Sequence, residues 1–137
     1  MFGKFFSKIK YKTQAKITFT LAKTFISYMN GFNEPWDKAY FRFHMSDNHY
    51  GCNGSYSLNG SAKLIGVFEN EELYDSLESI ALQLHEVMKK KVCTGGFRVA
   101  LLTITSDFDF DIKYEYTDIN KWKITKIDSN GIPIGLY

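Results

Sequence analysis

The stretch FRVALLTITSDFDFDIKYEY, residues 97–116, decides the fold. Residues 97–105 are apolar at almost every position, which is typical of a strand that is covered on both faces of a sheet. Ser106 and Asp107 then form a turn signal. In residues 108–116 aromatic and aliphatic residues alternate with charged ones, as in a strand with one buried and one exposed face. The stretch therefore predicts an antiparallel pair of strands whose second member has a mostly acidic outer face.

Three further strands are predicted upstream. Apolar and polar residues alternate over residues 39–45, which indicates a strand with one buried and one wetter face. After a turn at residues 46–49, a glycine-rich strand covers residues 50–58, and Asn59-Gly60 is a strong hairpin signal before a third strand at residues 62–68. Because glycines provide no side chain to pack, we expect this hairpin to be exposed or mobile and not central.

Two helices are predicted. Apolar residues recur every three or four positions from Ile17 to Phe32, although alternation over residues 11–21 would also fit a strand. The helix is favoured because the pattern from Ile17 onward fits no other period. A second helix covers residues 71–91: Asn70 can cap it, its first turn is acidic and its last turn is basic, as the helix dipole favours.

The predicted order is α-β-β-β-α-β-β, with a possible last strand at residues 123–127. With 137 residues, 45% of them hydrophobic and 23% charged, the chain fits one folded domain, residues 1–137. We predict an α+β domain in which a single antiparallel sheet of five to six strands is backed by two main helices. No apolar run approaches the roughly 20 residues of a membrane span, and the two cysteines have no metal or redox spacing, so we expect a cytoplasmic protein.

Charge is distributed unevenly along the chain. No acidic residue precedes Glu34, whereas residues 1–12 form a basic N-terminal segment with four lysines among aromatic residues. Such a segment could bind an anionic membrane or nucleic acid, or it could be the solvated start of a helix. The net charge of +2 does not by itself indicate a nucleic-acid partner.

No catalytic motif is present, so we expect no enzyme activity and no cofactor. His44 and His49 flank a turn that also contains Asp47, but ordinary turn chemistry explains these residues without a metal. Asp109 and Asp111 are two positions apart on the predicted strand and could serve a small metal-dependent hydrolase, which stays an alternative.

The most unusual feature is a concentration of acidic residues around the last strand. Its members are Asp107, Asp109, Asp111, Glu115 and Asp118. Their mutual repulsion is costly unless a cationic partner meets them, although a solvated surface would also hold them. Aromatic residues close by, Tyr114, Tyr116 and Trp122, are candidate anchors for such a partner.

Three segments carry a resemblance to a known family: EPWDKAYFRFHM at residues 34–45, NEELYDSLESIALQLHEVM at residues 70–88, and FRVALLTITSDFDFDIKYEYTDIN at residues 97–120. Together they resemble the YezG-like (DUF600) immunity proteins, over roughly residues 14–120. The most telling parts are Trp36 with Tyr40, and the run that leads into Tyr116 and Asp118.

The resemblance implies an antitoxin of a polymorphic or contact-dependent growth inhibition system. Such a protein protects the cell by binding a cognate toxin domain, commonly a nuclease. A carboxylate array could occlude the cationic site in which a nuclease holds phosphates. On this hypothesis the partner-binding residues are Asp107, Asp109, Asp111, Glu115, Tyr116, Asp118 and Trp122, and no direct contact with nucleic acid or membrane is expected.

Overall fold

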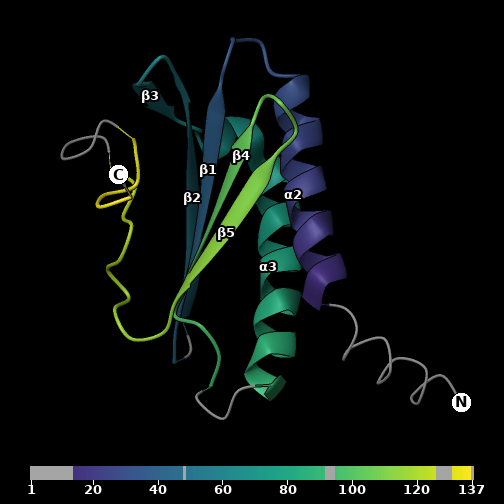
Figure 1. Cartoon of the computed structure of the whole chain (residues 1–137), viewed down its shortest axis with the longest axis vertical. Helices are drawn as coiled ribbons and strands as arrows, with labels where there is room; N and C mark the ends of the chain where they lie inside the picture. The colour runs from purple at the N-terminus through teal and green to yellow at the C-terminus, as the bar shows by residue number, and fades with distance from the viewer. Residues whose placement is uncertain (1–13, 48, 92–94, 126–130, 137) are drawn as a thin grey trace, which may run out of the picture.

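A computed structural model describes residues 14–47, 49–91, 95–125 and 131–136 (Figure 1). The elements follow the order α2 (Gln14–Asn30), β1 (Lys38–Ser46), β2 (His49–Leu58), β3 (Ser61–Leu64), the 3-10 helix η1 (Phe68–Asn70), α3 (Glu71–Lys91), β4 (Val99–Thr105) and β5 (Phe110–Glu115). The predicted α+β class and order are confirmed. The basic segment of residues 1–12 lies outside the described residues, and residues 123–125 form no strand.

The five strands form one antiparallel sheet in the order β3-β2-β1-β4-β5. Both helices lie on one face of the sheet, and the C-terminal segment after β5 crosses the other face (Figure 1). We call these the helix face and the outer face. None of the described helices is both long and apolar enough to cross a membrane.

The main core lies between the sheet and the helices. Phe25 of α2 packs edge-to-face on Phe41 of β1, with ring centroids 6.4 Å apart. The residues that α2 buries are Leu21, Ala22, Phe25 and Met29. They recur at three- and four-residue spacing, which confirms the helix over the alternative strand.

The outer face of β1 is buried, so the predicted wetter face is wrong. Arg42 is only 5% exposed, because the C-terminal segment packs over it. Arg42 Nε donates a hydrogen bond to the carbonyl of Lys121 at 2.9 Å, and its Nη2 donates to the carbonyl of Ile119. Beside these contacts lies a second, smaller hydrophobic cluster. Its members are Tyr40, Val99, Leu101, Trp122 and Ile124.

The hairpin of β2 and β3 differs from prediction in its first strand: β3 is an exposed edge strand as expected, but much of β2 is buried. Ser55, Tyr56 and Ser57 are buried, because β2 lies between β1 and β3 and both of its faces are partly covered. A Cβ at Gly54 would lie 2.9 Å from the carbonyl oxygen of Tyr40, so glycine at this position permits close packing and does not loosen it.

The loop between β3 and α3 is held by hydrogen bonds of the Asn70 side chain. β3 ends at Leu64 and not at Phe68, because the chain turns into η1. The expected cap residue, Asn70, uses its side chain for this loop: Nδ2 donates to the carbonyl of Gly66 at 2.8 Å, and Oδ1 accepts a hydrogen bond from the Tyr28 hydroxyl. The start of α3 is therefore fastened to α2.

We predict that Arg42→Ala lowers the free energy of unfolding by about 2–4 kcal/mol, because two carbonyls of the covering segment lose a charged donor. Urea denaturation measures the change. The matched control is Lys121→Ala, which removes an exposed side chain but keeps the carbonyl that Arg42 binds, and it should change stability by less than about 0.5 kcal/mol. Equal losses in the two variants would contradict this account.

Candidate functional site

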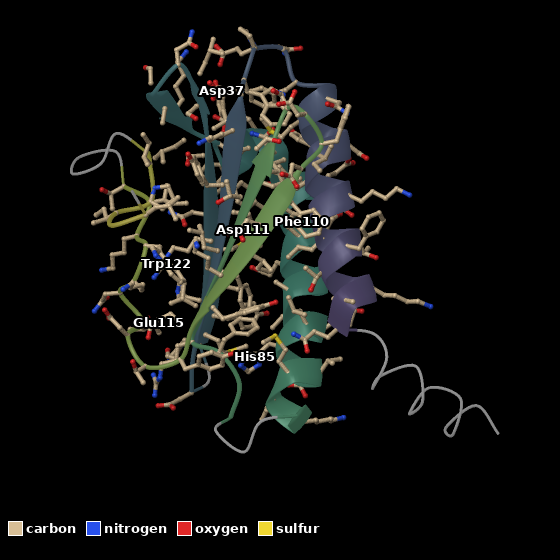
Figure 2. All side chains as sticks on the ribbon, viewed as in Figure 1. Asp37, His85, Phe110, Asp111, Glu115 and Trp122 are labelled. Carbon is tan, nitrogen blue, oxygen red and sulfur yellow. The ribbon has the colours of Figure 1, made fainter. Side chains whose placement is uncertain are left out.

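The predicted acidic residues fall into two groups along β5, and Figure 2 labels one member of each, Asp111 and Glu115. Asp107 and Asp109 lie in the turn between β4 and β5, close to Asp111, whereas Glu115 ends the strand and Asp118 follows it. At about 3.4 Å per residue, Asp111 and Glu115 are about 14 Å apart along the strand. The five carboxylates therefore do not form one compact array.

β5 begins at Phe110 and not at Phe108 as predicted, because the turn after β4 is longer than expected. Phe108 has a φ of 67°, which is left-handed backbone, and the ladder starts at Phe110. Thr105 N donates to the carbonyl of Asp109 at 2.9 Å, and Phe108 N donates to the carbonyl of Thr105 at 3.1 Å. Asp109 consequently belongs to the turn and not to the strand, so the expected pairing of Asp109 with Asp111 on one regular strand face is wrong.

The first group is solvent-exposed. Asp107, Asp109 and Asp111 are all exposed at the β4–β5 end of the sheet. Asp111 forms an ion pair with Lys113 at 3.7 Å, and since both side chains are about half exposed this pair is worth little. We call these three residues the upper acidic group.

The second group has a local structural role. Glu115 Oε2 accepts hydrogen bonds from Thr117 N at 3.1 Å, Thr117 Oγ1 at 3.0 Å and Asp118 N at 3.2 Å. The backbone and hydroxyl donors lower the pKa of Glu115. Asp118 Oδ1 in turn accepts from Asn120 N at 2.9 Å. These carboxylates shape the turn that leads the C-terminal segment onto the outer face.

Of the predicted aromatic anchors, Tyr116 is well exposed at the surface. Trp122 is only 9% exposed and belongs to the outer-face cluster, so the expectation that its ring is available to a partner is wrong. Tyr114 is half-buried on the helix face, where its ring lies 5.2 Å from Phe97 and its hydroxyl bonds with Thr18. Phe108, which prediction assigned to the apolar strand face, is 65% exposed beside the upper acidic group.

A pocket of about 380 Å³ lies next to Tyr116, at the end of the sheet opposite the upper acidic group. His85, Gly96 and Phe97 line it together with charged residues of both signs, among them Lys89 and Asp47. Prediction missed this pocket, because it joins α3, the end of β1 and the start of β4, which no sequence spacing connects. The mixed charge of its rim does not favour an ion of either sign.

His85 packs tightly against the loop before β4. It is 6% exposed, its ring meets Phe97 edge-to-face at 5.0 Å, and a Cβ at Gly96 would lie 2.9 Å from its Nε2. Gly96 also has a φ of 88°, so position 96 requires glycine for two reasons. Among the described residues Nδ1 of His85 has no hydrogen-bond partner.

Metal and thiol chemistry find little support in the described part of the chain. No three histidine, cysteine, aspartate or glutamate side chains gather there in a way that could hold a metal ion. His44 Nδ1 lies 3.4 Å from Arg42 Nη1 on the outer face, and the strand register places His44 opposite Gly51 and not opposite His49. Burial, with Glu78 nearby, raises the pKa of Cys52 to about 12, so this thiol stays protonated near neutral pH.

Stability should fall as the pH falls below neutral. Burial lowers the pKa of His85, and burial with Arg42 and Lys123 lowers that of His44. The unfolded chain therefore binds more protons than the folded one as the pH drops through about 6.5, which favours unfolding.

Urea denaturation at pH 7.5 and pH 5.5 tests this, with His85→Gln as the variant. The variant should lose less stability between the two pH values than the unchanged protein. An identical loss in both would show that His85 does not contribute to the pH dependence.

Comparison with known proteins adds no family to this description. No family model matches the chain, and no curated protein matches it. The likeness to YezG-like immunity proteins therefore stays a prediction that depends on the three segments quoted above. The candidate site is defined by its own residues: the upper acidic group, with Phe108 beside it and the open strand β5 that supports it.

Proposed function

We propose that the protein is an immunity protein that binds a cognate toxin domain, and that the toxin presents a cationic, phosphate-binding site such as that of a nuclease. The observation that carries the proposal is the upper acidic group, which consists of three exposed carboxylates at the β4–β5 end of the sheet. Within the described residues, the ion pair of this group is the weak one between Asp111 and Lys113. The resemblance of residues 34–45, 70–88 and 97–120 to immunity proteins supports the same function.

The proposed mechanism is occlusion of the site in which the toxin holds its substrate. A nuclease site is cationic because it binds phosphates, so a fixed carboxylate array fits the same electrostatic field. Complementary charge speeds association, whereas affinity needs apolar anchors that lose water in the interface. Exposed Phe108 and Tyr116 are the available rings near the two ends of β5, and Trp122 is not among them.

Glu115 and Asp118 have a secondary part in this proposal. Their carboxylates already accept backbone hydrogen bonds within the turn that follows β5. A partner would have to compete with those bonds. We therefore assign charge recognition to Asp107 and Asp111, and to Asp109 through its second carboxylate oxygen, since Oδ1 accepts from Phe110 N. The hydrolase alternative gains no support, because Asp109 directs a carboxylate oxygen to the N–H of Phe110 at 2.9 Å.

The test uses the double variant Asp107→Lys with Asp109→Lys against the toxin domain encoded beside the gene. Calorimetry at two salt concentrations should show binding weakened about tenfold or more at low salt and less at high salt. The melting temperature should hardly change, because both side chains are exposed.

The matched control is Glu72→Lys with Asp75→Lys, which reverses two exposed acidic residues on α3. This control should weaken binding much less. Equal weakening by both double variants would mean general charge attraction only, and unchanged binding in the first variant would place the interface elsewhere. If the neighbouring gene encodes no toxin domain, and no growth protection is observed, the proposed function is wrong.

A further inference from the structure

β5 is an open edge of the sheet. It pairs with β4 on one side, and no described strand lies along its other side. β3, at the opposite edge, is only four residues long, and Gly131 of the C-terminal segment packs against Ala62 and Lys63. An uncovered edge strand of six residues is a template for pairing with another strand.

The backbone groups available at this edge follow from the ladder. Thr105 N donates to the carbonyl of Asp109, so this pair is a hydrogen-bonded one, and such pairs recur at every second residue of an antiparallel ladder. The N–H and C=O groups of Phe110, Ile112 and Tyr114 therefore point away from β4. The N–H of Phe110 already donates to Asp109 Oδ1 at 2.9 Å, whereas the remaining groups need a partner strand or water.

The sequence of β5 is complementary to itself. Residues 110–114 read Phe-Asp-Ile-Lys-Tyr, and two copies that run antiparallel about Ile112 place Asp111 opposite the partner's Lys113. The two-fold symmetry forms this charge pair twice. On the other face Phe110 lies opposite the partner's Tyr114, and Ile112 meets its own copy. This register also joins the outward-pointing backbone groups of the two strands.

We propose that β5 pairs antiparallel with β5 of a second copy of this chain, centred on Ile112, so that the two sheets become one continuous sheet. The occupant of the open edge is thus another molecule of the same protein. The contact is isologous: the same strand from each copy supplies both halves of every pair.

The helix layer leaves room for this arrangement. α2 packs beneath β4, so the two α2 helices would be separated by three strand spacings, about 14 Å. Directly packed helices are about 8–10 Å apart, so large side chains must fill the difference. The half-buried rings of Phe110 and Tyr114 lie at this place.

Phe19 of α2 is placed to fill the space between the two α2 helices. It is 59% exposed, and it precedes Tyr28 by nine residues, which is about two and a half helical turns. The two side chains therefore lie on opposite sides of α2. Tyr28 contacts Asn70 at the start of α3, so Phe19 faces away from α3, toward the side on which the second copy would lie.

One pair in this register is unfavourable. Asp109 lies opposite the partner's Glu115 at each end of the paired stretch, and like charges that face each other destabilise a sheet. The carboxylate of Glu115 is held within its own turn by Thr117 and Asp118. Removing the charge at position 109 should therefore strengthen the contact.

This inference does not rest on the proposed toxin binding. The dimer pairs the residues of β5, among them Asp111, whereas the toxin-binding test changes Asp107 and Asp109 in the turn before the strand. A dimer in solution would exist with or without a toxin. The double variant Asp107→Lys with Asp109→Lys would place a lysine opposite the partner's Glu115, so it should strengthen the dimer while it weakens toxin binding. Failure of either proposal is thus distinguishable from failure of the other.

The test measures the molar mass of the full chain over a range of concentrations by sedimentation and light scattering, in low salt. The unchanged protein should form dimers. Asp111→Lys and Lys113→Asp each place two like-charged pairs opposite each other, so each should raise the dimer dissociation constant by about tenfold or more. Circular dichroism should show that both variants stay folded, because both side chains are exposed.

Mixing the two single variants gives the sharpest result. In a mixed dimer the two lysines of one chain face the two aspartates of the other, so native mass spectrometry should show the heterodimer in preference to either homodimer. The double variant Asp111→Lys with Lys113→Asp should restore the homodimer. Asp109→Asn should strengthen it.

Lys63→Asp on β3 serves as the control for general charge effects, since this lysine lies on the opposite edge strand. It should leave the dimer unchanged. A protein that stays monomeric at all concentrations would overturn the proposal, and so would a dimer that neither single charge variant weakens. A failure of the mixed variants to pair would also overturn the register about Ile112.

Discussion

β1 and β4 are far apart in the sequence, yet they pair from Lys38 with Thr105 to His44 with Val99 at the centre of the sheet. This pairing joins the first half of the chain, which supplies α2 and the β1–β2–β3 strands, to the second half, which supplies β4 and β5. Each half alone would expose the apolar helix face of its strands. The helices, the two edges and the outer cover therefore all depend on this one long-range contact.

The cover on the outer face depends on a buried charge. Arg42 points away from the helices and donates to the carbonyls of Ile119 and Lys121, which an apolar side chain could not do. Asn53 and Ser55 add bonds to the carbonyls of Ile124 and Gly131. With the C-terminal segment held over β1 and β2, β5 is left as the longer open edge and presents its polar side chains to solvent.

The two proposals overlap at Asp111. Toxin binding would use Asp111 together with Asp107 and Asp109 in the turn before β5, whereas self-association would use the backbone of the strand and the pair Asp111 and Lys113. In a dimer the two upper acidic groups would lie at opposite ends of the paired stretch, where each Asp109 faces the partner's Glu115. A cationic partner would relieve this repulsion, so binding of such a partner and dimer formation would favour each other.

The sequence by itself determined the class and order of elements, because periods of two and of three to four residues report local geometry: the stripe from Leu21 to Met29 and the apolar run of β4 were predicted correctly. Only the tertiary structure decided which polar residues are buried. The sequence pattern predicts exposed positions for Arg42, Trp122 and the glycine-rich β2. In the structure they are largely buried, because the C-terminal segment, which contains Trp122, packs on the outer face of the sheet. The alternation of apolar and polar residues defines the two faces of a strand, but the burial of each face depends on what packs against it. A contact between distant segments therefore cannot be predicted from the local sequence pattern.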